Sequence, residues 1–103
     1  MEIEIVKTER WRKITEFPQY HVSDKGRVKS VFNTDRKCKS IMSNPEGLKF
    51  VRLYDKGRPR DRYIHKLVAT EFLGYRKGDR ITWADKNRMN NTVENLIVVR
   101  QET

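Results

Sequence analysis

Hydrophobic and polar residues alternate in short runs between residues 20 and 62, a pattern that predicts β-strands. The runs 20–23 and 27–31 flank Asp24-Lys25-Gly26, a hairpin turn with glycine where a positive φ is needed. Further strands are expected over residues 37–43 and 48–54. Strong turn signals follow each of these two runs, at 44–47 and 55–59. Residues 20–62 are therefore predicted to form one small antiparallel meander.

Two segments before this sheet have different patterns. Residues 1–6 alternate apolar and acidic side chains, as in a short edge strand or a contact with a partner. An apolar series at spacings of three follows, but Pro18 excludes one continuous helix through it. We expect an irregular segment whose large side chains seed the core rather than stack on bases: Trp11, Ile14, Phe17 and Tyr20.

The period changes after residue 62. Ile64, Leu67, Val68 and Phe72 recur at helical spacings, which predicts an amphipathic helix over 63–73 that ends at Gly74. His65 lies beside this apolar stripe, where a lone histidine is more often a hydrogen-bonded structural residue than a catalyst.

The last part of the chain combines an extended segment, an asparagine-rich loop and a capping signal. Residues 80–83 are predicted to be extended, and Asn91 with Glu94 three residues later has capping-box spacing, which predicts a helix start. The β-branched run 97–99 predicts a last strand or a core-packed tail.

Composition sets the class of protein. With 103 residues and 36% hydrophobic residues, the chain fits one α+β domain over 1–103, comprising a basic sheet lobe at 20–62 and a helix with the final motif at 63–103. The lone cysteine, Cys38, excludes an internal disulfide and a multi-cysteine zinc knuckle, and is read as a half-buried strand residue. No apolar run approaches the roughly 20 residues of a membrane span, and residues 1–6 are too short and acidic for a signal peptide. A cytoplasmic protein is expected.

Charge is unevenly distributed along the chain, whose net charge is +9. Residues 25–62 hold twelve basic and four acidic side chains, and therefore carry +8 of the total. Such clustering favours a polyanion partner, nucleic acid before membrane, over a merely solvated sheet face. A two- or three-stranded ribbon fits the DNA major groove. The candidate DNA-binding residues are Arg27, Lys29, Lys37, Lys39, Lys49, Arg52, Lys56, Arg58, Arg60 and Arg62.

The order of several motifs resembles a known family. The chain reads W-R-K-I, then Y-H-V-S-D-K-G-R-V-K-S, a basic hairpin, Y-I-H-K-L-V-A-T-E-F and finally D-K-N-R-M-N-N-T-V-E-N-L. Over residues 11–99 this is similar to the HNH homing endonucleases of phage introns, with their N-terminal nuclease-associated module. The resemblance implies a ββα-metal unit, a basic sheet in the major groove and one divalent ion at the scissile phosphate.

The catalytic positions of that family are altered in this chain. Relatives usually carry an Asp-His or Asn-His pair on the strand before the asparagine loop, and these positions fall on Thr82 and Trp83. The central asparagine falls on Asn95 and is kept, and a further metal-binding residue would lie just past Thr103. Indole has no basic nitrogen for general-base catalysis, and a threonine hydroxyl is a poorer ligand for a hard divalent ion than a carboxylate. We therefore expect no catalytic residue, no metal and no cofactor, with Trp83 filling the vacated pocket.

The resulting hypothesis is a nuclease-dead, HNH-like protein that binds double-stranded DNA, as a phage-encoded transcriptional regulator or site blocker. Asn87, Asn90 and Asn91 either contact phosphate or order the loop. A homodimer through residues 1–6 and 97–99 is one further expectation. Two rival functions stay open: a divergent metal-dependent nicking enzyme, with His21 or His65 in a rearranged site, and a module that binds and inhibits a host protein.

Overall fold

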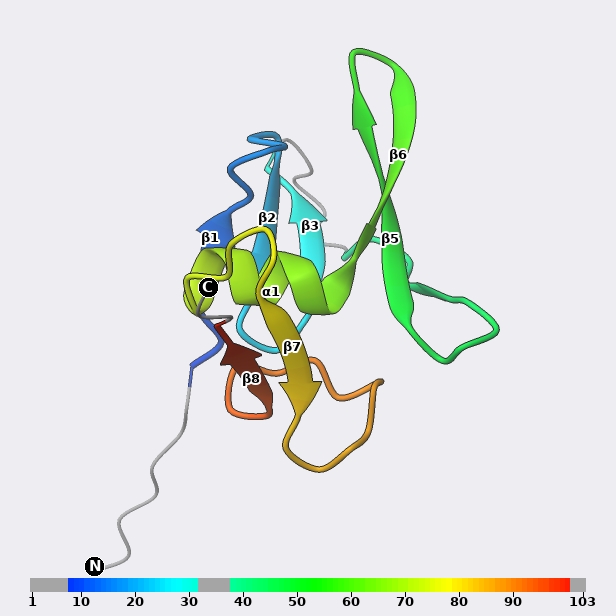
Figure 1. The fold of residues 1–103 in the computed structure, drawn as a ribbon. Coiled ribbons are helices and arrows are strands. Elements are labelled where there is room, and N and C mark those ends of the chain that lie inside the picture. Colours follow the sequence, from blue (N-terminus) through cyan, green and yellow to red (C-terminus); the bar gives the residue numbers. More distant parts are fainter. Residues whose placement is uncertain (1–7, 32–37, 101–103) are drawn as a thin grey trace, which may run out of the picture.

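The computed structural model describes residues 8–31 and 38–100, which form an α+β fold (Figure 1). Within these residues three antiparallel sheets, β1-β2-β3, β4-β5-β6 and β7-β8, surround one helix, α1 (Ile64–Phe72). The strands are β1 (Trp11–Lys13), β2 (Tyr20–Ser23), β3 (Val28–Ser30), β4 (Met42–Ser43), β5 (Lys49–Asp55), β6 (Arg58–Tyr63), β7 (Arg80–Trp83) and β8 (Leu96–Val99).

The prediction of one meander over residues 20–62 is wrong, because these strands belong to two separate sheets. Residues 37–43 do not form a continuous strand: Cys38 makes only an isolated bridge to Lys29, and β4 is two residues long. The first sheet instead gains β1, which pairs with β2. Valines and leucine from both sheets are fully buried in one core, so the sheets converge on it rather than lie side by side: Val22, Val28, Val51 and Leu53.

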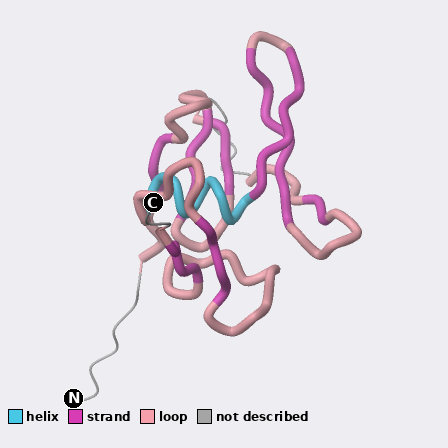
Figure 2. The backbone as a smooth tube through the Cα atoms, in the orientation of Figure 1, coloured by secondary structure: helices cyan, strands magenta, loops and turns pink. Residues whose placement is uncertain are grey.

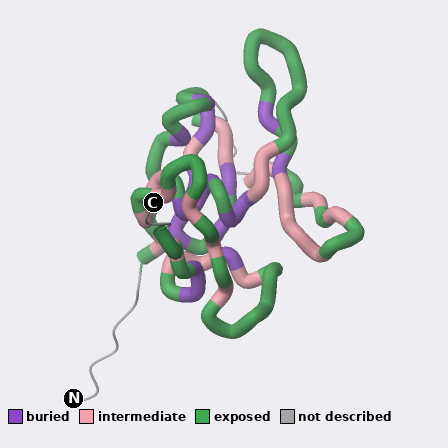
Figure 3. Tube along the Cα trace, viewed as in Figure 1, coloured by how far each residue is buried: buried purple, intermediate pink, exposed green. Residues whose placement is uncertain are grey.

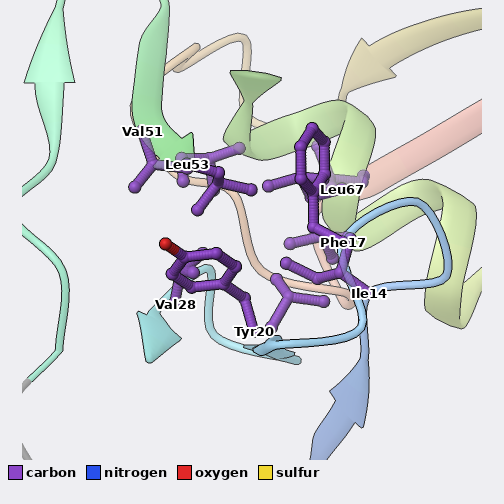
Figure 4. Close-up of a cluster of buried hydrophobic side chains, with 11 residues drawn as sticks. Ile14, Phe17, Tyr20, Val28, Val51, Leu53 and Leu67 are labelled. Atoms are coloured by element: carbon purple, nitrogen blue, oxygen red, sulfur yellow. The ribbon is translucent and has the colours of Figure 1, made fainter. Parts of the chain in front are cut away.

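Helix α1 is central to that core. Ile64, Leu67 and Val68 are buried, as their spacing predicts, and the helix contacts strands of all three sheets. Gly74 ends it in a left-handed conformation with a φ of 71°. Figure 4 shows Leu67 in one cluster with side chains from β2, β3, β5 and the segment before β2.

The segment before the second strand behaves as expected, with one exception. Ile14, Phe17 and Tyr20 are buried and belong to the core. Trp11 lies instead in β1 and is partly exposed, with the Lys29 ammonium 4.1 Å from the centroid of one of its rings.

The β5–β6 hairpin projects from the body of the molecule (Figures 1 and 2). Its predicted turn is confirmed: Lys56 and Gly57 both have positive φ values, 52° and 79°, as a two-residue hairpin turn requires. Val51 and Leu53 anchor its base, whereas its far end is exposed (Figure 3). The turn predicted at 44–47 is also present, with Gly47 at a φ of 82°.

The prediction of a helix that begins at Asn91 is wrong. Residues 93–95 make a single turn, in which the amides of Asn95 and Leu96 both bond to the Thr92 carbonyl oxygen. The chain then enters β8, because the run 97–99 is β-branched and pairs with β7. The Asn91 side chain accepts a hydrogen bond from Trp83. The strand expected over 97–99 is confirmed.

Two expectations lie outside the described residues: the edge strand or partner contact at 1–6, and Lys37. Cys38 is half-buried, as expected, although it belongs to a bridge rather than a strand. No helix of the described chain is long and apolar enough to cross a membrane.

Two glycines with similar backbone angles provide a test of the packing around α1. Gly26 has a φ of 82°, and a Cβ atom built on it would lie 2.9 Å from the Asn91 carbonyl oxygen. Gly57 has a φ of 79° and open space around it. We predict that Gly57→Ala costs about 1–2 kcal/mol of backbone strain, and that Gly26→Ala costs about 3 kcal/mol or more because overpacking adds to strain. Urea denaturation measures both. Equal losses of unfolding free energy in the two variants would contradict the close approach of Gly26 to Asn91.

Candidate nucleic-acid interface

The predicted DNA-binding residues do not share one face. Arg27, Lys29 and Lys39 lie in or near the first sheet, and Lys37 is outside the described residues. The other six belong to the β5–β6 hairpin: Lys49, Arg52, Lys56, Arg58, Arg60 and Arg62.

The register of the hairpin separates these six residues further. Residues on an antiparallel pair alternate between two faces, and directly opposed residues share a face. Arg62 opposes Val51 and Arg60 opposes Leu53, so these arginines are on the side of the buried residues, here called the core face. Arg52 opposes Asp61 on the other side, here called the outer face. The outer face consists of Phe50, Arg52, Tyr54, Pro59, Asp61 and Tyr63.

Three of the predicted arginines are neutralised by carboxylates. Arg52 bonds Asp61 through Nε at 2.9 Å, and Arg62 bonds Glu16 through Nη2 at 2.5 Å. Arg27 bonds Glu9, with Nε 2.8 Å from Oε2. Hydrogen bonds from these arginines lower the pKa values of Glu9, Glu16 and Asp61, so all three carboxylates stay charged at neutral pH.

The uncompensated charge lies toward the hairpin tip. Among the described residues, Lys56, Arg58 and Arg60 have no ion-pair partner, and all three are exposed. Lys39 is held differently, with its ammonium 5.8 Å from the Tyr20 ring centroid and 5.5 Å from that of Tyr54.

A count of charges along the sequence does not show which carboxylates pair with these arginines. Glu9 and Glu16 precede the basic region and reach it only through the fold. The Asp61 pair was available from sequence, since a two-residue turn at 56–57 places residue 52 opposite residue 61.

Asn95 organises the loop between β7 and β8. It is buried, and its amide nitrogen donates to Asp85 Oδ1 at 2.9 Å and to the Asn90 carbonyl oxygen at 2.8 Å. Its Oδ1 accepts from the Asp85 amide at 3.1 Å. The central asparagine of the motif therefore holds the loop together.

Asp85 is the other centre of this loop. Its carboxylate accepts from the Asn90 side chain at 2.8 Å and from the Asn87 amide at 2.8 Å. Hydrogen bonds from Asn90, Asn87 and Asn95 lower the pKa of Asp85. Of the two readings for the asparagines, loop ordering is the one that these bonds support.

Trp83 packs inward on β7. Its indole Nε1 donates to Asn91 Oδ1 at 2.8 Å, and its ring meets His65 edge-on, with centroids 5.0 Å apart. Thr82, the neighbouring residue, is exposed and opposes Ile97 on the outward side of the β7–β8 ribbon.

The two histidines lie in different places. His21 is in β2, in another sheet from Trp83. His65 is buried beside Trp83, and its Nδ1 has no hydrogen-bond partner within the described structure. Burial, with a smaller effect of Lys66, lowers the pKa of His65 to about 4. His65 is thus a neutral, buried residue at physiological pH, although the hydrogen bond expected for it is absent at Nδ1.

Known proteins resemble this chain over most of its length. Residues 9–56 match the NUMOD4 motif. The chain is 26% identical over 100 residues to the H-N-H endonuclease F-TflII of Escherichia phage T5, covering 94% of this chain and 51% of that protein. A solved structure described as "DNA binding and cleavage by the HNH homing endonuclease I-HmuI" matches with a TM-score of 0.78 and 29% identity, covering 87% of this chain and 52% of the other. The chain thus spans about half the length of each relative.

The Asn95 network predicts unequal costs for two asparagine substitutions. Asn95→Ala removes three buried or half-buried hydrogen bonds and should lower the free energy of unfolding by about 2–3 kcal/mol. Asn87→Ala is the matched control, because its exposed side chain accepts one bond, from the Met89 amide, and should cost about 0.5–1 kcal/mol. Chemical denaturation compares them. A cost for Asn95→Ala no greater than for Asn87→Ala would contradict the central role of Asn95.

Proposed function

The chain is a relative of the HNH homing endonucleases of phages and carries the NUMOD4 motif, and from this premise we propose that it binds double-stranded DNA without cutting it. The biological role proposed for such a protein is that of a phage-encoded transcriptional regulator or site blocker. Fold and relationship support DNA binding, whereas the argument against cleavage comes from the chain's own side chains.

The observation that carries the proposal is the state of Trp83. It stands where the family resemblance places the general base, and its indole nitrogen carries a hydrogen that it donates to Asn91. That nitrogen has no lone pair available to accept a proton from water. The histidine that packs against it, His65, is 6% exposed and has a pKa of about 4, so water access and basicity are both low there.

The family also implies a divalent metal ion, and the residues around Asp85 do not fit one. Both Asp85 oxygens already accept hydrogen bonds from asparagines. A hydroxyl at Thr82 and an indole at Trp83 supply no second strong oxygen ligand. Across residues 8–31 and 38–100, no three histidine, cysteine or acidic side chains gather into a metal-binding group.

The β5–β6 hairpin is the proposed DNA-contacting element. A two-stranded ribbon fits the major groove, and this one projects from the body with Lys56, Arg58 and Arg60 exposed (Figure 1). These three side chains would bind phosphates, which supply most of the sequence-independent affinity.

Self-association stays a prediction. Ile97 and Val99 are 47% and 44% exposed on the outward side of β8. Burying them against a second copy would require no change in the fold described here. The sedimentation coefficient of the protein, with and without DNA, tests this part of the proposal.

Plasmid nicking tests the absence of cleavage. Supercoiled plasmid incubated with the pure protein and Mg²⁺ or Mn²⁺ should stay supercoiled, while a mobility shift shows that the protein is bound. The same incubation with Asn95→Ala is the control for contaminating nuclease. Nicking by the parent protein that disappears in Asn95→Ala would establish an active enzyme and overturn the proposal.

The salt dependence of binding tests the hairpin. Arg58→Ala with Arg60→Ala should weaken duplex binding and reduce the slope of log K against log salt by about 1.8, because two phosphate contacts are lost. Arg76→Ala with Lys77→Ala removes the same charge at the other end of α1 and should change the slope much less. Equal effects of the two double variants would exclude the hairpin as the main contact. A flat slope with tight binding to a host protein would favour the protein-inhibitor alternative.

A further inference from the structure

The ion pair between Arg52 and Asp61 differs from the other arginine pairs in its position. Arg52 donates from Nε to Asp61 Oδ1 at 2.9 Å and from Nη2 to Oδ2 at 3.3 Å, so the contact is two-pronged. Both residues lie on the outer face of the projecting hairpin, and their side chains are 49% and 46% exposed. The Arg62 guanidinium, by contrast, is on the core face, 5.0 Å from the Phe17 ring centroid.

This geometry leaves a defined edge of the Arg52 guanidinium unused. Arginine has five N–H donors in a planar fork. Asp61 takes the Nε donor and one Nη2 donor, so both Nη1 hydrogens and the second Nη2 hydrogen have no partner in this pair. Two parallel donors at the end of the fork are what a bidentate contact with guanine O6 and N7 requires.

The outer face is also the side of the hairpin that can lie against DNA along its length. The core face cannot, because Val51 and Leu53 are fully buried against the body. Arg58 and Arg60 lie on the edge strand β6, and their long side chains extend from the core face. With the outer face toward the groove floor, these two arginines start on the opposite face and would reach the flanking phosphates around the β6 edge of the hairpin.

The contact proposed for Arg52 and the phosphate contacts of the hairpin differ in net charge. The Arg52–Asp61 pair has no net charge, so it adds little to the general attraction of phosphates. The hydrogen bond to Arg52 lowers the pKa of Asp61, and the carboxylate stays ionised at neutral pH. A carboxylate so close to DNA opposes binding in general, and it is tolerated where it orients a group that reads a base.

We propose that Asp61 is a positioning residue that holds Arg52 for recognition of one guanine in the major groove of the target duplex. This inference rests on the proposed DNA binding, and it divides the hairpin into a base-reading pair on the outer face and phosphate-binding cations near the tip.

The test compares two neutralising variants of equal charge. Asp61→Asn frees Arg52, and Glu16→Gln frees Arg62. Each raises the net charge by one, so each should steepen the salt slope by up to about 0.9. Selection of duplexes from a random library by the parent protein, followed by sequencing, should show one position that requires a G·C pair. In Asp61→Asn the preference for G·C over other base pairs at that position should fall by about tenfold or more. In Glu16→Gln that preference should be unchanged.

A second pair of variants covers the case in which Asp61→Asn fails to fold, as judged by circular dichroism. Arg52→Lys keeps the charge and a bond to Asp61 but removes the fork, so the guanine preference should fall with no change in salt slope. Asp61→Glu restores the carboxylate and should recover part of the preference.

The outcomes separate this inference from the proposed function. Absence of duplex binding by the parent protein would overturn both. Selective binding in which Asp61→Asn or Arg52→Lys keeps the same guanine preference would overturn the role of Asp61 and leave DNA binding intact. Equal loss of preference in Asp61→Asn and Glu16→Gln would assign the effect to charge alone and also overturn it.

Discussion

The packing of α1 against strands of all three sheets is the interaction on which the rest of the structure depends. Among the described residues no strand of one sheet is paired with a strand of another, and the one isolated bridge joins Lys29 of β3 to Cys38, which lies outside the strands, so hydrogen-bonded ladders do not hold the sheets together. The buried face of α1 does, and burial of each side chain such as Ile64 or Val68 contributes about 1.5–3 kcal/mol. Because β6 ends at Tyr63 and α1 begins at Ile64, no linker separates the projecting hairpin from the core. His65, one residue further, contacts Trp83 in β7. One helix therefore sets the direction of the hairpin and carries the histidine that packs against the indole.

Carboxylates neutralise part of the charge of the basic region and orient the arginine side chains that they bind. Arg27, Arg52 and Arg62 are each paired, whereas Lys56, Arg58 and Arg60 near the hairpin tip are exposed and have no ion-pair partner among the described residues. Exposed pairs of this kind contribute little to stability, about 0–1 kcal/mol each. Their main physical effect is orientation: a guanidinium held by a carboxylate has fewer accessible conformers and a fixed set of free donors. In the proposed function, affinity and selectivity then come from different residues of one hairpin.

Local patterns predicted the elements better than their assembly. The helix predicted over 63–73 is present as α1, and the turns predicted at 44–47 and 55–59 are present too, the second as a two-residue turn at 56–57; all three follow from apolar period and glycine placement. The division into two sheets could not be read from strand patterns, because it depends on both β-lobes burying residues against the same helix. The false helix at Asn91 has a similar cause: its side chain bonds to Trp83, a residue eight positions earlier, and the β-branched run after it favours a strand. For the candidate site, the resemblance pointed to Thr82, Trp83 and Asn95, and the structure adds the hydrogen bonds by which Asn95 holds the loop. The arginine pairs with Glu9 and Glu16 required the fold itself.

The central claim is that the indole of Trp83 occupies the place where a hydrolytic site would need a base, with no divalent ion beside it. Paramagnetic line broadening by Mn²⁺ tests this most directly, followed in ¹⁵N NMR spectra of the protein alone and bound to a duplex. We predict that the Trp83 indole N–H and the amides of Thr82 and Asp85 broaden no earlier in the titration than those of other surface loops. Selective broadening of these three signals at low Mn²⁺, in either state, would place a metal ion at the loop and contradict the account.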